Sequence, residues 1–262
     1  MKIWYQSGLA LERFPSYKKH LKEHLERAAD PGTEFEIHGT TKGGAGIEYR
    51  FGELLFTGDI LANALKAEKQ GCAAFTIGST NDAGLFQSRE ALNIPVIGIT
   101  EAAVMVAGMM GRNFSLITPN EKMIPRFEDI IARYKAEKRL AGIRHMDFKI
   151  PELDKVFNDP ALQQKQLTEF TEGARLTIQD GAEVIIPIGG MASLFLAKSG
   201  LKEIDGVPVL DTITIAVKVT EMMVKLKELT GTFVSRRLSF ASPPEEILRQ
   251  VMQDYGLTDT SE

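Results

Sequence analysis

The stretch GCAAFTIGST at residues 71–80 returns in altered form as GAEVIIPIGG at residues 181–190. Each copy starts with glycine, continues as an apolar run of strand length and ends in a turn of small residues. A Leu-Phe pair and then a Pro-Val step follow each copy. We interpret the copies as βαβ units of two duplicated lobes related by a pseudo-twofold axis, with chance similarity of two apolar runs as the alternative.

Outside these copies, short apolar runs alternate with longer segments whose apolar residues lie three and four positions apart. This alternation is typical of parallel strands joined by helical crossovers. The predicted strands are 2–5, 35–39, 73–77, 96–99, 114–118, 183–188 and 207–210. The predicted long helices are 16–29, 54–69, 121–135, 160–179 and 213–229, with a final short helix at 243–255. Residues 137–159 lack a sustained period, so we expect a short strand, a hairpin or an excursion there.

We therefore expect an α/β fold of two similar Rossmann-like or flavodoxin-like lobes, each with a parallel sheet, and an active site between them. Lobe one would comprise residues 1–112 plus 213–262, and lobe two residues 113–212. The methionines at helical spacing, including Met105 and Met222, are interpreted as packing residues or as part of a subunit contact.

The composition excludes several classes of function. With 262 residues, 44% hydrophobic and 25% charged, the chain matches ordinary globular proteins. A net charge of −4 without a basic stripe argues against nucleic acid as a partner. Because no apolar stretch reaches about 18 residues and the start lacks a signal-peptide pattern, we expect a cytoplasmic protein without a membrane partner. The single cysteine, Cys72, excludes an internal disulfide and a pair of catalytic thiols.

Ligands of open parallel sheets bind outside the carboxyl ends of the strands, where loops lead into helix N-termini. The turns after the two copied strands, at 78–82 and 189–193, are rich in small residues that let a carboxylate approach the backbone. Ser79 and Thr80 offer hydroxyls there. For Asn81 and Asp82, capping of a helix is at least as good an explanation as chemistry. Thr118 and Asp211 follow other strands at the same edge.

Six segments together resemble one known superfamily. Residues 39–48, GTTKGGAGIE, resemble the GT-x-x-G-x-x-x-I-E stretch of hydantoin and allantoin racemases. Similar matches occur at 71–79, 94–103, 112–118, 181–191 and 207–211, in the same order and spacing. The chain is thus identified as a member of the aspartate/glutamate/hydantoin racemase superfamily over most of its length.

This resemblance implies an enzyme without cofactor or metal, acting on a small carboxylate or cyclic amide and commonly forming homo-oligomers. In the family, two cysteines on opposite faces of the substrate exchange the proton on a carbon next to a carbonyl. Each cysteine falls eight residues after the glycine that opens its strand. The same count here gives Ser79 and Gly189, so both thiols are absent. Cys72 starts a strand and is expected in the core.

Without the thiols, three interpretations stay open. The first is an isomerase or racemase that moves protons through oxygen groups. The second is a decarboxylase, hydrolase or carbon–carbon lyase in the same cleft, and the third is a binding protein without catalysis. The candidate catalytic residues are Ser79, Asp82 and Asp211. The candidate substrate-binding residues are Gln6, Ser7, Tyr49, Thr80, Asn81, Thr118, Gly189, Gly190 and Met191.

Overall fold

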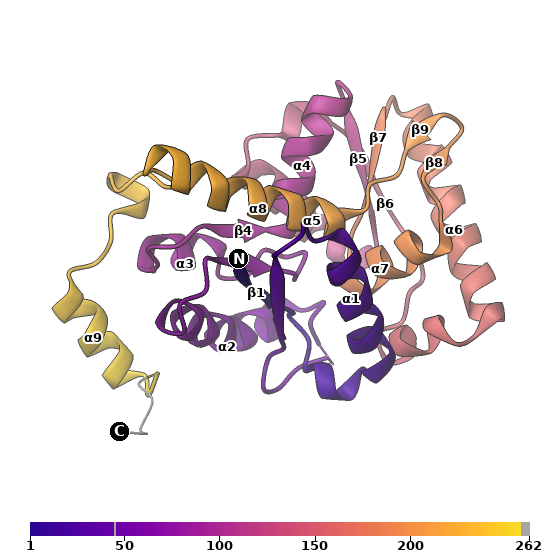
Figure 1. Ribbon diagram of the computed structural model, residues 1–262. Coiled ribbons are helices and arrows are strands. Elements are labelled where there is room, and N and C mark those ends of the chain that lie inside the picture. The colour runs from indigo at the N-terminus through magenta and orange to yellow at the C-terminus, as the bar shows by residue number, and fades with distance from the viewer. Residues whose placement is uncertain (45, 258–262) are drawn as a thin grey trace.

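Two parallel sheets form the framework of the computed structural model, which describes residues 1–44 and 46–257 (Figure 1). The first sheet has the order β2-β1-β3-β4, with β1 (Lys2–Gln6), β2 (Glu34–His38), β3 (Ala74–Ile77) and β4 (Val96–Gly98). The second has the order β6-β5-β7, with β5 (Phe114–Thr118), β6 (Leu140–His145) and β7 (Val184–Pro187). The predicted α/β fold with two parallel-sheet lobes is confirmed.

Helices connect and cover these strands. They are α1 (Pro15–Ala28), α2 (Arg50–Lys69), α3 (Leu85–Ala91), α4 (Ile99–Met110), α5 (Ile124–Arg133), α6 (Pro160–Gln179), α7 (Gly190–Ser199), α8 (Thr212–Thr230) and α9 (Glu245–Asp254). Short 3₁₀ turns lie at η1 (Leu11–Arg13), η2 (Glu121–Met123), η3 (Glu137–Arg139), η4 (Ile150–Phe157) and η5 (Leu238–Phe240). Within the described residues, no helix has the length and apolarity needed to cross a bilayer.

The two sheets share one topology. In each, the first strand of the lobe lies in the middle, the second lies at one edge and the third lies on the other side. The fourth position, occupied by β4 in the first sheet, is filled in the second by a single parallel bridge between Val209 and Ile185. The predicted strand at 207–210 is therefore mostly replaced by a hairpin of β8 (Glu203–Ile204) and β9 (Val207–Pro208). Pro208 has no N–H to donate to a ladder, which limits longer pairing.

Strand β6 lies in the stretch that the sequence left open. It is an edge strand whose residues, LAGIRH, mix a glycine and two polar side chains with apolar ones. Its pairing with β5 shifts register between Phe114 and Ser115. An edge strand buries only part of its surface, so its apolar pattern is weak.

The lobes share a core instead of meeting across solvent. One cluster of buried apolar residues joins Tyr5 and Tyr17 of the first lobe to Ile117 and Ile185 of the second. Helix α8 returns to the first lobe and packs against α4, α1 and β3, while α1 also contacts α7 and η4 of the second lobe. The carboxyl ends of β3 and β7 are thereby held facing each other.

Candidate active site

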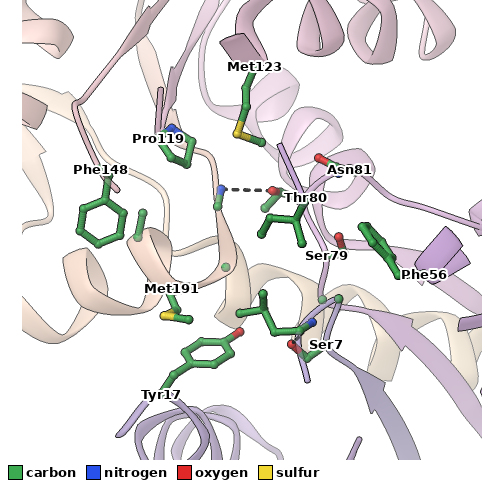
Figure 2. A pocket seen from close by; sticks show the side chains of 17 residues that line it. Ser7, Tyr17, Phe56, Ser79, Thr80, Asn81, Pro119, Met123, Phe148 and Met191 are labelled. Atoms are coloured by element: carbon green, nitrogen blue, oxygen red, sulfur yellow. Dashed lines mark hydrogen bonds between the residues drawn. The ribbon is translucent and has the colours of Figure 1, made fainter. Parts of the chain in front are cut away.

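The turns that follow β3 and β7 touch each other. The Gly189 N–H donates a hydrogen bond to the Thr80 hydroxyl over 3.1 Å, as Figure 2 shows. A Cβ atom placed on Gly190 would lie 3.2 Å from the carbonyl oxygen of Gly78. The sequence places Ser79 and Gly189 at matching positions, and the structure brings these two turns to one cleft between the lobes.

A cavity of about 620 Å³, counting its opening to solvent, lies at this contact (Figure 2). Its apolar wall is formed mainly by Leu9, Ile47, Phe56, Pro119, Met123, Phe148, Met191 and Ala192. Its polar side chains are Ser7, Tyr17, Ser79, Thr80 and Asn81, beside the glycines at 8, 78, 189 and 190. Among the described residues, no carboxylate, imidazole, ammonium, guanidinium or thiol lines this cavity. Tyr17 is its one ionisable side chain within that part of the chain.

Ser79 faces the cavity from the first turn, and its Oγ has no hydrogen-bond partner among the described residues. A Cβ on Gly8 would approach this oxygen to 2.8 Å. The absence of a side chain at Gly8 therefore provides the space that the Ser79 side chain occupies. Ser7, from the same loop, accepts a hydrogen bond from the Leu9 N–H over 3.2 Å.

Tyr17 enters the cavity from α1 and was not among the predicted site residues. It is buried, and a Cβ on Gly190 would lie 3.0 Å from its hydroxyl. Burial raises the pKa of the Tyr17 phenol well above its ordinary value of 10, so the group is a neutral donor at physiological pH. Asp154 of the second lobe fixes it by accepting from the Tyr17 N–H over 2.8 Å.

Gly189 has a backbone conformation suited to glycine, with φ of +97°. A Cβ there would also approach Cγ of Pro119 to 2.8 Å. The position that matches a family cysteine thus has no space for a side chain unless the backbone or Pro119 moves. Cys72 supplies no substitute, because it is buried two residues before β3 begins and lies outside the cavity lining.

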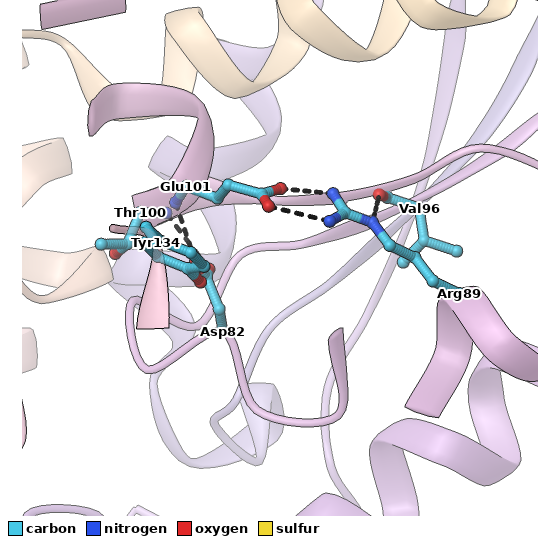
Figure 3. Close-up of polar contacts among 6 residues, drawn as sticks. All are labelled: Asp82, Arg89, Val96, Thr100, Glu101 and Tyr134. Carbon is cyan, nitrogen blue, oxygen red and sulfur yellow. Dashed lines mark hydrogen bonds and ion pairs between the residues drawn. The ribbon is translucent and has the colours of Figure 1, made fainter. Parts of the chain in front are cut away.

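Asp82 is buried behind the first turn and does not line the cavity. Its carboxylate accepts hydrogen bonds from the N–H groups of Thr100 (3.1 Å) and Glu101 (2.8 Å) and from the Tyr134 hydroxyl (Figure 3). Burial raises the pKa of Asp82 to about 7, against the lowering effect of these hydrogen bonds. Asp82 thus caps α4, and Tyr134 ties that cap to the second lobe.

Asp211 also serves as a cap. It accepts from the N–H (3.0 Å) and hydroxyl (2.6 Å) of Thr214 at the start of α8, and it pairs with Nε2 of His24 at 2.9 Å. Arg27 donates to Nδ1 of His24, which leaves Nε2 to carry the proton toward Asp211. Burial would raise the pKa of Asp211, but His24 and Thr214 outweigh it and hold the pKa below its usual value. Asp211 does not line the cavity.

Three predicted binding residues also lie outside the cavity lining. Gln6 is fully buried and bonded to Trp4, Asn63 and the Ser7 carbonyl. The Thr118 hydroxyl donates to backbone carbonyls of its own lobe. Tyr49 is half exposed at the start of α2. Of the predicted residues, Ser7, Ser79, Thr80, Asn81, Gly189, Gly190 and Met191 line the cavity.

Arg126 of α5 forms a network of polar contacts with first-lobe residues at the cavity. Its guanidinium donates to the carbonyls of Ile47 (2.9 Å) and Glu48 (3.0 Å) and pairs with Glu53 at 3.1 Å. The same Glu53 oxygen accepts from the Asn81 amide over 3.4 Å. Arg126 of the second lobe thereby holds Ile47 of the first lobe in the cavity wall.

Comparison with known proteins agrees with this architecture. The family described as Asp/Glu/Hydantoin racemase matches residues 15–220. A hydantoin racemase of Rhizobium meliloti is 36% identical over 180 residues, covering 68% of this chain and 71% of the relative. A hydantoin racemase of Pseudomonas sp. (strain NS671) is 29% identical over 93% of both chains. The solved allantoin racemase from Klebsiella pneumoniae superposes with a TM-score of 0.77, at 25% identity and 94% coverage of both chains. The chain therefore belongs to the Asp/Glu/Hydantoin racemase family and is a racemase-type enzyme.

Proposed function

We propose that this enzyme moves the proton on a carbon next to a carbonyl in a small cyclic amide or carboxylate, with no cofactor and no pair of thiols. The observation that carries the proposal is the cavity at the junction of the two turns. Hydroxyls, backbone amides and one buried phenol converge there, while the described lining contains no thiol or carboxylate.

Hydrogen-bond donors in the cavity suit a carbonyl or carboxylate. Gly190 and Met191 begin α7, so their N–H groups have no acceptor within the helix, and both residues line the cavity. The Tyr17 hydroxyl lies beside them. When the carbon-bound proton leaves, its electron pair moves onto the carbonyl oxygen, and donors aimed at that oxygen stabilise the enolate.

The proton itself would go to water or hydroxide held by the hydroxyl groups of the cavity walls, and the same solvent would return a proton to the enolate. Ser79 lies on the wall of the first turn and Tyr17 on the side of the second. Return of a proton to the opposite face of the planar enolate inverts the carbon. A serine hydroxyl is a weak base, so we expect catalysis to depend more on enolate stabilisation than on proton abstraction.

The apolar wall favours a substrate with an apolar substituent. Phe56, Met123 and Phe148 surround the space beyond the polar turns. The named relatives are hydantoin and allantoin racemases, which supports a cyclic amide as the core of the substrate. We therefore place hydantoins with alkyl or aryl substituents ahead of allantoin, whose substituent is polar.

The test is incubation of the protein in deuterated water with substituted hydantoins, allantoin and α-substituted acids, followed by NMR and chiral analysis. Deuterium uptake at the α-carbon with inversion supports the proposal. A new product without inversion indicates a decarboxylase, hydrolase or lyase instead. Saturable binding across the panel without exchange or product contradicts the proposal and favours a binding protein.

A further inference from the structure

Helix α9 stands away from the rest of the molecule at the end of an extended segment (Figure 1). One side of it is apolar, because Ile247, Val251 and Tyr255 recur every four residues. These side chains are 51%, 45% and 79% exposed. None of the clusters of buried apolar residues in the described chain includes a residue of α9.

Such a helix needs a packing partner. A helix of ten residues is marginal in water, and its stability in proteins comes mainly from burial of its apolar face. Pro243 and Pro244 hold the chain extended directly before α9, with Pro244 at φ −51° and ψ 141°.

An apolar groove on the body lacks an occupant among the described residues. It lies between α4, α8 and the segment at 233–240, and measures about 930 Å³ with its opening. Met105 and Met222 on its walls are 66% and 56% exposed. Further lining comes from Pro95, Met223, Phe233 and Phe240. Methionine-lined grooves adapt their shape to the apolar face of a docking helix.

Helix α9 is acidic, and two cations lie beside Phe233 at one side of the groove, whose lining also holds the Arg89–Glu101 ion pair. Helix α9 carries Glu245, Glu246 and Asp254 against one arginine. At the rim, Arg236 and Lys227 lie over the Phe233 ring and donate to backbone carbonyls and an amide oxygen. Neither forms an ion pair with a carboxylate among the residues that the structure describes.

We propose that α9 of one copy docks in the methionine-lined groove of a second copy of this chain. The exchange is reciprocal, so each copy gives one helix and receives one, and the contact closes as a twofold dimer. The acidic ends of the helix then meet Arg236 and Lys227 of the other copy. This dimer does not depend on the proposed function, because neither α9 nor the groove lines the active-site cavity.

The full-length protein, measured by light scattering after size exclusion at micromolar concentration, is expected to be a dimer or a multiple of it. The Ile247→Asp/Val251→Asp variant should have half the parent's mass, because both apolar side chains that α9 places in the groove are replaced by carboxylates. Arg249→Gln/Gln253→Asp, which changes the charge by the same two units on the opposite side of α9, is the matched control and should associate as the parent does. Circular dichroism should show the same fold in all three.

A mixing experiment tests the direction of docking. Met105→Asp/Met222→Asp alters the groove, and each defective protein alone should be the smaller species. Mixed in equal amounts, they should form a heterodimer, since the intact helix of the groove variant fits the intact groove of the helix variant. A monomeric parent, an α9 variant with the parent's mass, or no association on mixing would each overturn the proposal.

Discussion

The two turns that face each other across the cavity have the same place in their lobes but different chemistry. At an offset of 110 residues, Ser79, Thr80, Asn81 and Asp82 of the first turn correspond to Gly189, Gly190, Met191 and Ala192 of the second. The first turn supplies hydroxyl, amide and carboxyl side chains. The second supplies backbone N–H groups and space.

This difference shows how a duplicated framework can divide its roles. Gly189 cannot hold a side chain in its present conformation, and the phenol of Tyr17 reaches the second turn from α1 instead. The group near the second turn therefore comes from the first lobe and is fixed by Asp154 of the second. Four substitutions, taken from the largest expected effect to the smallest, test this division.

Asp82→Asn should produce the largest change, in the pH dependence of stability. The Asp82 carboxyl keeps its proton up to about pH 7 in the folded chain, whereas the unfolded chain ionises near 3.8. The unfolded state binds fewer protons in between, so stability falls as the pH rises from about 4 to about 7, by on the order of 4 kcal/mol. Asparagine tolerates the φ of +48° and removes this dependence.

Urea unfolding at pH 4.5 and 8 measures the effect. Exposed Asp129, which pairs with Arg50 on the surface, is the matched control as Asp129→Asn. It should keep the parent's pH slope. An Asp82→Asn variant that also keeps the parent's slope would show that Asp82 ionises like a surface acid. The two turns, with Asp82 in the first and Ala192 in the second, would then not differ in their electrostatic contribution to stability.

Tyr17→Phe should lower kcat for exchange and inversion by about 100-fold while KM changes little, as expected for loss of a donor to the enolate. Tyr5→Phe is the control, because the Tyr5 hydroxyl is equally buried but has no hydrogen-bond partner in the described part of the chain and does not line the cavity. It should retain full turnover. If both variants remained active, the second turn would function through its backbone alone.

Gly189→Ala should destabilise the fold by about 2 to 3 kcal/mol. The left-handed helical region costs an alanine about 1 to 2 kcal/mol, the ψ of 115° takes Gly189 outside even that region, and contact with Pro119 adds to the cost. Gly181→Ala isolates the first contribution, since Gly181 has φ +98° with nothing within 4 Å of its Cβ position. Denaturation midpoints should rank parent, Gly181→Ala, Gly189→Ala. Equal midpoints for the two variants would mean that Pro119 does not restrict position 189.

Ser79→Ala should have the smallest effect, about a tenfold loss in kcat, because a hydroxyl without a base contributes less than a full general base. Ser193→Ala removes a hydroxyl that binds the Pro187 carbonyl outside the cavity, and should leave turnover unchanged. Initial rates of deuterium uptake compare them. An undiminished rate in Ser79→Ala would remove the first turn's hydroxyl from the mechanism.

Much of the fold follows from the sequence, and so does the location of the cavity. Strands such as Phe114–Thr118 are buried on both faces and are mostly apolar, and α6 has the predicted bounds. The repeat located Ser79 and Gly189, which the structure brings to one cavity. These features depend on local pattern and on the shared edge of parallel strands.

Other parts depend on contacts between distant residues. Sequence alone does not show that Asp82 meets the N–H groups of α4, or that Asp211 is occupied by His24 and Thr214. Tyr17 looked like an ordinary residue of an amphipathic helix, because its position depends on Asp154 in a stretch without a regular pattern. A polar residue at a strand end therefore indicates where a site lies. It does not show which polar side chains line the cavity and which are bonded to other parts of the protein.

The Arg126 contacts bear on how a ligand binds in the cavity. Its guanidinium binds the carbonyls of Ile47 and Glu48 and also the Glu53 oxygen that accepts from the Asn81 amide. The backbone at Ile47, which lines the cavity, and the Glu53 carboxylate, which holds the cavity-lining Asn81, thus share Arg126 as a partner. A ligand that takes the Asn81 amide from Glu53 would leave that carboxylate oxygen with Arg126 as its remaining partner among the described residues.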